Sequence, residues 1–135
     1  MATSASVLCG LKRGAIGGTV AHDHHNIIVA GTNEADMALC VRALHASQGG
    51  FVLVADGHIL GQLPLPIAGL LSDRPVLEII AALEKLTELS RGLGGKLPAP
   101  FMTLSFISLP TVPELGLTDQ GLVNVREHRL ISPFV

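Results

Sequence analysis

The sequence contains no tryptophan, no tyrosine and only four phenylalanines in 135 residues, and it carries little charge. Asp, Glu, Lys and Arg make up 15% of the chain, against about 25% in a typical globular domain. The net charge is −2, whereas nucleic-acid-binding proteins normally show a basic stripe and, for single strands, aromatic stacking platforms. We therefore expect no nucleic-acid partner. The low charge also predicts that another domain or subunit covers part of the surface, and we expect a homo-oligomer.

Cysteines and long apolar runs are also scarce. Cys9 and Cys40 lack CxxC spacing, which favours two reduced core thiols over a disulfide or a metal pair. Gln62, Pro64 and Pro66 interrupt the longest apolar run, which stays well short of the roughly 20 residues that span a bilayer. The first ten residues lack the basic and apolar regions of a signal peptide. These features predict a cytoplasmic protein with no membrane partner.

The chain length fits a single domain covering residues 1–135. Asp56-Gly57 between two alternating apolar runs predicts a β-hairpin. One helix is expected after a Thr32 or Asn33 N-cap and ends at Gly49-Gly50. A second is expected after a Ser72 or Asp73 cap, with a wide apolar stripe. Strands are expected over 6–11, 26–30, 102–109, 122–125 and 129–135. The pattern predicts an α+β fold, a sandwich in which two main helices pack on one mixed β-sheet.

Most of the chemically unusual side chains lie in one stretch, 22–26, which reads HDHHN. If this stretch is extended, His22, His24 and Asn26 share one face, and His22 and His24 stand about 6.5 to 7 Å apart at the backbone. Such a pair is a feasible two-ligand clip for a metal, but a transition metal needs three or four ligands. His22, His24 and His25 are therefore candidate metal ligands. The alternative is a polar loop whose side chains bind only backbone groups.

With these residues laid out, the chain resembles the C-terminal domain of bacterial adenine deaminase, a member of the amidohydrolase superfamily. The matching stretches span nearly the whole chain in order: GLKRGAI at 10–16, VAHDHHNIIVAGTNEADMA at 20–38, LPLPIAGLLSD at 63–73, PFMTLSFISLP at 100–110 and PELGLTDQGLVNV at 113–125.

The resemblance implies a role in purine salvage. Such enzymes hydrolyse adenine to hypoxanthine and ammonia, acting on a C–N bond of a cyclic amidine. They bind manganese or iron in a (β/α)8 barrel that carries the metal ligands, and no barrel of roughly 250 residues fits in this chain. The resemblance therefore implies an accessory C-terminal domain that is catalytically incomplete alone, with the amidohydrolase barrel as its partner and adenine as the ligand of the full enzyme.

The family pattern at the histidine stretch reads AHDSHN, so His22, Asp23, His25 and Asn26 match, whereas His24 stands where a serine would be. By this resemblance His22 and Asp23 are candidate catalytic residues, and His25 and Asn26 are candidate substrate-binding residues. Two alternatives stay open. The chain is either an independent module that binds a metal or small ligand through the histidines, or a structural or dimerisation domain.

Overall fold

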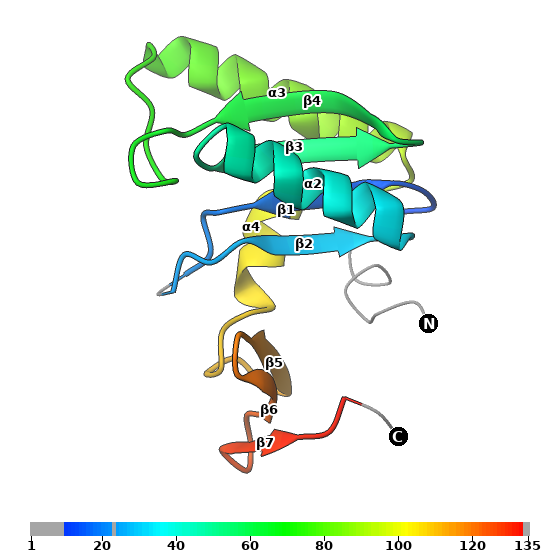
Figure 1. The fold of residues 1–135 in the computed structure, drawn as a ribbon, viewed down its shortest axis with the longest axis vertical. Coiled ribbons are helices and arrows are strands. Elements are labelled where there is room, and N and C mark those ends of the chain that lie inside the picture. Colours follow the sequence, from blue (N-terminus) through cyan, green and yellow to red (C-terminus); the bar gives the residue numbers. More distant parts are fainter. Residues whose placement is uncertain (1–9, 23, 134–135) are drawn as a thin grey trace.

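The computed structural model describes residues 10–22 and 24–133 (Figure 1). In chain order the elements are β1 (Ala15–Gly18), β2 (Ile28–Gly31), α2 (Glu34–Ala46), β3 (Gly50–Ala55), β4 (His58–Pro64), α3 (Val76–Gly92), α4 (Pro100–Phe106), β5 (Leu115–Thr118), β6 (Gly121–Asn124) and β7 (Arg129–Ile131). The α+β class is confirmed. The expected strand over 6–11 lies mostly outside the described residues, and Gly10 and Leu11 are not in a strand.

The body of the molecule is a four-stranded sheet in the order β2-β1-β3-β4. All neighbouring strands in it are antiparallel, and so are those of the second sheet, β5-β6-β7. The prediction of a mixed sheet was therefore wrong. Parallel pairs require long crossover connections, whereas β3 and β4 are joined directly at the predicted Asp56-Gly57 turn.

The central strand β1 was not predicted, because its sequence AIGG reads as a loop. All four of its residues are buried, as expected of a strand covered on both faces. A Cβ on Gly17 would lie 3.2 Å from Leu44 Cδ1 of α2. The small residue at this position therefore lets helix α2 approach the strand closely.

Helix α2 covers one face of this sheet (Figure 1). The Asn33 side chain accepts a hydrogen bond from the backbone N–H of Asp36, so one of the two predicted N-caps is confirmed. The helix ends at Ala46, just before the predicted glycine pair. The core on this side consists of small and medium side chains: Ala15, Cys40, Ala43, Leu44, Val52 and Val54.

Helices α3 and α4 cover the opposite face (Figure 1). The larger core lies here and includes Ile16, Leu53, Leu63, Leu86, Phe101 and Leu104. The fold thus has helices on both faces of the four-stranded sheet. The alternation of Val52, Leu53 and Val54 between the two cores is the period-two pattern of a strand.

Helix α3 differs from its prediction at its N-terminal end. Pro75 occupies the N-cap position, and no side chain caps the helix, so the assignment of Ser72 or Asp73 as cap was wrong. Only part of the apolar stripe is buried: Val76 and Leu77 are 68% and 75% exposed. The stripe is wider than the sheet face that it packs on.

The predicted strand over 102–109 was wrong, because Pro100–Phe106 forms helix α4. Proline at the first helical position is pre-organised for a helix start. Phe101, Leu104 and Ser105 are buried, which is the i, i+3, i+4 pattern of a helix face. The Thr103 hydroxyl donates to the Ala99 carbonyl within the first turn.

The three-stranded sheet β5-β6-β7 lies beyond α4, at one end of the molecule (Figure 1). Strand β6 confirms the strand expected over 122–125, β7 confirms the first three residues of the one expected over 129–135, and β5 was not predicted. No helix among the described residues is long and apolar enough to cross a membrane.

Candidate functional site

The histidine stretch lies in the connection between β1 and β2. The predicted strand over 26–30 begins only at Ile28, so His22, His24, His25 and Asn26 are in a loop and do not alternate across a sheet. The backbone N–H of His25 donates to the Ala21 carbonyl at 2.9 Å. His25 itself has a φ of 50°, a left-handed conformation that few residues other than glycine adopt.

The loop is attached to helix α4 through an aromatic contact. The rings of His22 and Phe106 have centroids 5.0 Å apart and are tilted by 36°, within the range of favourable ring pairs. His22 is half-buried by this contact, and Phe106 is still 43% exposed. The contact brings together two segments that are far apart in the sequence.

The His24 ring has one nitrogen that is satisfied and one that is not. Its Nδ1 accepts a hydrogen bond from the backbone N–H of Asn26 at 3.0 Å. A neutral imidazole with an accepting Nδ1 carries its proton on Nε2. That Nε2 is buried and has no hydrogen-bond partner among the described residues. The loop therefore contains a buried donor that has no acceptor among the described residues.

The other candidate site residues are solvent-facing or lie outside the described residues. His25 and Asn26 are exposed, and Asp23 is outside the described residues. In the described part of the chain, no group of three His, Cys, Asp or Glu side chains could hold a metal ion. The assignment of His22, His24 and His25 as metal ligands stays a prediction, and a complete site would need further ligands.

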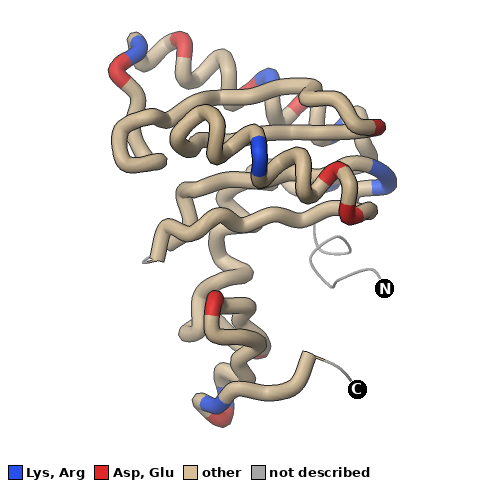
Figure 2. Tube along the Cα trace, viewed as in Figure 1, with Lys and Arg blue, Asp and Glu red and all other residues tan. Residues whose placement is uncertain are grey.

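The surface around the loop carries almost no charge. Between Arg13 and Glu34 the only Asp, Glu, Lys or Arg is Asp23, and there is none between Lys96 and Glu114. The two segments contact each other through α4, β1 and β2, and Figure 2 shows α4 and β2 without charged positions. Exposed apolar side chains lie on them: Ile27, Met102 and Phe106.

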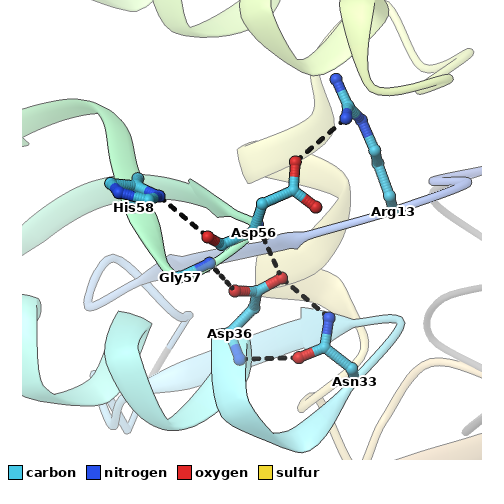
Figure 3. A network of polar contacts seen from close by, with 6 residues as sticks. All are labelled: Arg13, Asn33, Asp36, Asp56, Gly57 and His58. Carbon is cyan, nitrogen blue, oxygen red and sulfur yellow. Dashed lines mark hydrogen bonds and ion pairs between the residues drawn. The ribbon is translucent and has the colours of Figure 1, made fainter.

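A second polar cluster is centred on Asp36 (Figure 3). It was not predicted from the sequence. The Asp36 carboxylate accepts hydrogen bonds from the backbone N–H of Gly57 at 2.8 Å, from that of Asp56 at 3.3 Å and from the Asn33 side chain at 2.7 Å. It thus ties the start of α2 to the β3–β4 turn. Sequence reasoning treated Asp36 only as an acid in the first helical turn, and the Asn33-x-x-Asp36 spacing was the available signal.

Asp36 is buried, with 3% of the residue exposed. Burial raises its pKa, but the hydrogen bonds from Asn33, Gly57 and Asp56 together outweigh burial and hold the pKa below the usual 3.8. The nearby Cys40 is fully buried, and burial together with the Asp36 charge raises the pKa of its thiol to about 12. The prediction of a reduced core thiol is confirmed for Cys40, which is free, while Cys9 lies outside the described residues. Both groups are structural.

Comparison with known proteins identifies the family. Residues 5–129 match the adenine deaminase C-terminal domain. The chain is 54% identical over 125 residues to an adenine deaminase of Desulforamulus reducens, covering 93% of this chain and 21% of that protein. It is 53% identical over 122 residues to an adenine deaminase of Dehalococcoides mccartyi, covering 90% of this chain and 21% of the relative.

A third relative, adenine deaminase 2 of Carboxydothermus hydrogenoformans, is 56% identical over 117 residues, covering 86% of this chain and 20% of the relative. The chain thus spans about a fifth of the length of the curated relatives that it matches. Nearly all of the described fold lies within the matched residues. The chain belongs to the adenine deaminase C-terminal domain family.

Proposed function

We propose that this chain is an accessory domain of an adenine deaminase that converts adenine and water to hypoxanthine and ammonia, and that it is inactive alone. The observation that carries the proposal is the match to one fifth of full-length adenine deaminases. The remaining four-fifths would supply the catalytic barrel, as a second part of the same chain or as a separate subunit. The proposed domain extends over 1–135, and the proposed location is the cytoplasm.

Within that enzyme, the histidine loop would face the purine. His22 and Asp23 would hydrogen-bond ring nitrogens or guide a proton, and His25 and Asn26 would contact the base. An imidazole suits this role because it can donate and accept protons near neutral pH. Support comes from the exposure of His25 and Asn26 and from the uncharged surface around the loop.

The manganese or iron implied for the family does not fit the described residues, which provide no group of three suitable ligands. In the proposed enzyme the metal would belong to the barrel, and the present chain would only orient or enclose the substrate. No step proposed for His22, His25 or Asn26 depends on a metal bound by this chain.

A chimera tests the proposal. The matching region of the Desulforamulus reducens adenine deaminase is replaced by this chain, and adenine turnover is compared with that of the parent enzyme. We expect an active chimera and no turnover by the isolated chain. His22→Phe in the chimera keeps a ring against Phe106 but removes both nitrogens, so we expect kcat/KM to fall at least tenfold with an unchanged melting temperature. Asp23→Asn should lower it similarly.

His45→Phe is the matched control, because His45 is an exposed histidine on α2. It should leave kcat/KM within twofold of the unmodified chimera. An active chimera whose kinetics are unchanged by both His22→Phe and Asp23→Asn would remove the histidine loop from the proposed function. An inactive but folded chimera would argue against the accessory role itself.

A further inference from the structure

The small sheet β5-β6-β7 carries a row of apolar side chains across one face, beside Asn124 and Arg129, which share that face. Leu117 pairs with Leu122, and Leu122 pairs with Ile131, so these three side chains point to the same side of the sheet. Leu115 is two residues from Leu117 on the same strand and shares that side. We call this set, Leu115, Leu117, Leu122 and Ile131, the leucine face. Leu115 and Leu117 are 52% and 45% exposed.

On the opposite face, the β5 part of the sheet rests on the chain that leads into it, whereas Leu130 of β7 is exposed. A Cβ on Gly116 would lie 2.6 Å from the Leu109 carbonyl oxygen, so the backbones are in close contact there. The backbone N–H of Leu117 also donates to the Ile107 carbonyl at 2.9 Å. These contacts attach the sheet to the end of α4 and leave Leu115 and Leu117 of the leucine face exposed, while Leu122 and Ile131 are half-buried.

No described helix or strand of the body packs extensively against this sheet, which projects beyond α4 (Figure 1). Sheets of three short strands need a hydrophobic face packed on something to be stable. Contiguous exposed apolar side chains, such as Leu115 and Leu117, often mark an interaction site on a soluble protein. The leucine face is therefore a candidate interaction surface.

The charges on the sheet indicate what kind of partner fits. Arg126 pairs with Glu114, and Arg129 pairs with Glu127. Because these groups are matched within the sheet, they attract no partner of opposite net charge. An apolar surface with few charges would fit the leucine face, since interface cores are depleted in charged residues.

We propose that the leucine face docks onto the catalytic part of adenine deaminase. This inference rests on the proposed function, in which the four-fifths of each relative outside the matched region lies next to this domain. The sheet and the histidine loop both contact the chain at the C-terminal end of α4, the sheet through the Ile107 carbonyl and the loop through Phe106, so docking the sheet would fix the position of the loop against the catalytic part. A second copy of this chain is the competing occupant.

Hydrogen exchange tests the inference in the chimera described above, with the isolated 135-residue chain as reference. We expect backbone amides of 115–131 to exchange at least tenfold more slowly in the chimera than in the isolated chain. Leu117→Asp should abolish that protection. Leu130→Asp is the matched control, because Leu130 is a comparably exposed leucine that pairs with Val123 on the opposite face, and it should keep the protection.

An active chimera without extra protection of 115–131 would overturn the inference while leaving the proposed function intact. Equal loss of protection in both variants would also overturn it, because the effect would not depend on the leucine face. So would an isolated chain that sediments as a dimer and becomes a monomer in Leu117→Asp, since the face would then join two copies. A folded chimera with no adenine turnover, by contrast, would count against the proposed function.

Discussion

Asp36 and His24 both have polar atoms that are shielded from solvent, but they differ in whether those atoms have hydrogen-bond partners. The Asp36 carboxylate accepts hydrogen bonds from Asn33, Asp56 and Gly57 (Figure 3). The Nε2 of His24 has no partner among the described residues. A buried polar atom without a partner costs free energy, and such atoms in native proteins call for an explanation.

The difference separates two kinds of polar cluster. Around Asp36, the bonds from Asp56 and Gly57 join α2 to the β3–β4 turn and those with Asn33 cap the helix, so the cluster stabilises the fold. In the histidine loop, His25 and Asn26 are exposed, and the surrounding surface is uncharged. We infer that the Asp36 cluster serves stability and the histidine loop serves an interaction, and that substitutions should separate these roles.

Asp36→Ala should have the largest effect on stability. It leaves the backbone N–H groups of Asp56 and Gly57 without their acceptor, and we expect a loss of about 3 kcal/mol in the free energy of unfolding. Urea denaturation measures it. Asp56→Asn is the control, because asparagine tolerates the left-handed φ of 54° at this turn position, while the ion pair with Arg13 that it removes is exposed and such pairs contribute less than about 1 kcal/mol. Equal losses in the two variants would mean that the hydrogen bonds to Asp36 stabilise the fold no more than the exposed ion pair does.

The ionisation of Asp36 predicts a smaller change in the free energy of unfolding, which appears only in acid. Its folded pKa lies below the usual 3.8, so the stabilisation is fully present above that value and is lost as the pH falls through the folded pKa. Asp36→Asn lacks this titration. The difference in unfolding free energy between wild type and Asp36→Asn should therefore be constant from pH 7 to about pH 5 and should shrink below about pH 4. A difference that stays constant down to pH 3 would contradict the assignment.

The fold was predictable where local chemistry decides it. The Asp56-Gly57 turn and the Asn33 cap were both identified from the sequence, because turn and cap preferences depend on a few adjacent residues. Strand β1 was not identified, because AIGG becomes a strand only by pairing with β2 and β3. Helix α4 was mistaken for a strand, since a short apolar run between prolines fits either state.

The candidate site was predictable in composition but not in geometry. The sequence located the concentration of histidines, yet the alternation assumed for His22 and His24 depended on where β2 begins. The contact between His22 and Phe106 joins segments that no local pattern connects. The role of Asp36 could not be predicted for the same reason. The N–H groups of Asp56 and Gly57 reach its carboxylate only when α2 packs beside the hairpin.

His25→Gly should have the smallest effect on stability and so sharpens the contrast with Asp36. Removing an exposed side chain with a φ of 50° relieves strain of about 1 kcal/mol, and the greater freedom of glycine in the unfolded chain offsets a similar amount. We expect the unfolding free energy to change by less than about 0.5 kcal/mol, measured by urea denaturation of the isolated chain.

In the chimera, the same His25→Gly substitution should raise KM for adenine, because the lost imidazole is proposed to contact the purine. Gln48→Gly is the matched control, since Gln48 is also exposed and has a φ of 59° but lies away from the loop, after α2. It should leave both stability and KM unchanged. If His25→Gly instead costs more than about 2 kcal/mol, a size typical of lost buried interactions, the loop is held by its own side chains. It would then resemble the Asp36 cluster, and the division between a cluster for stability and a loop for interaction would not hold.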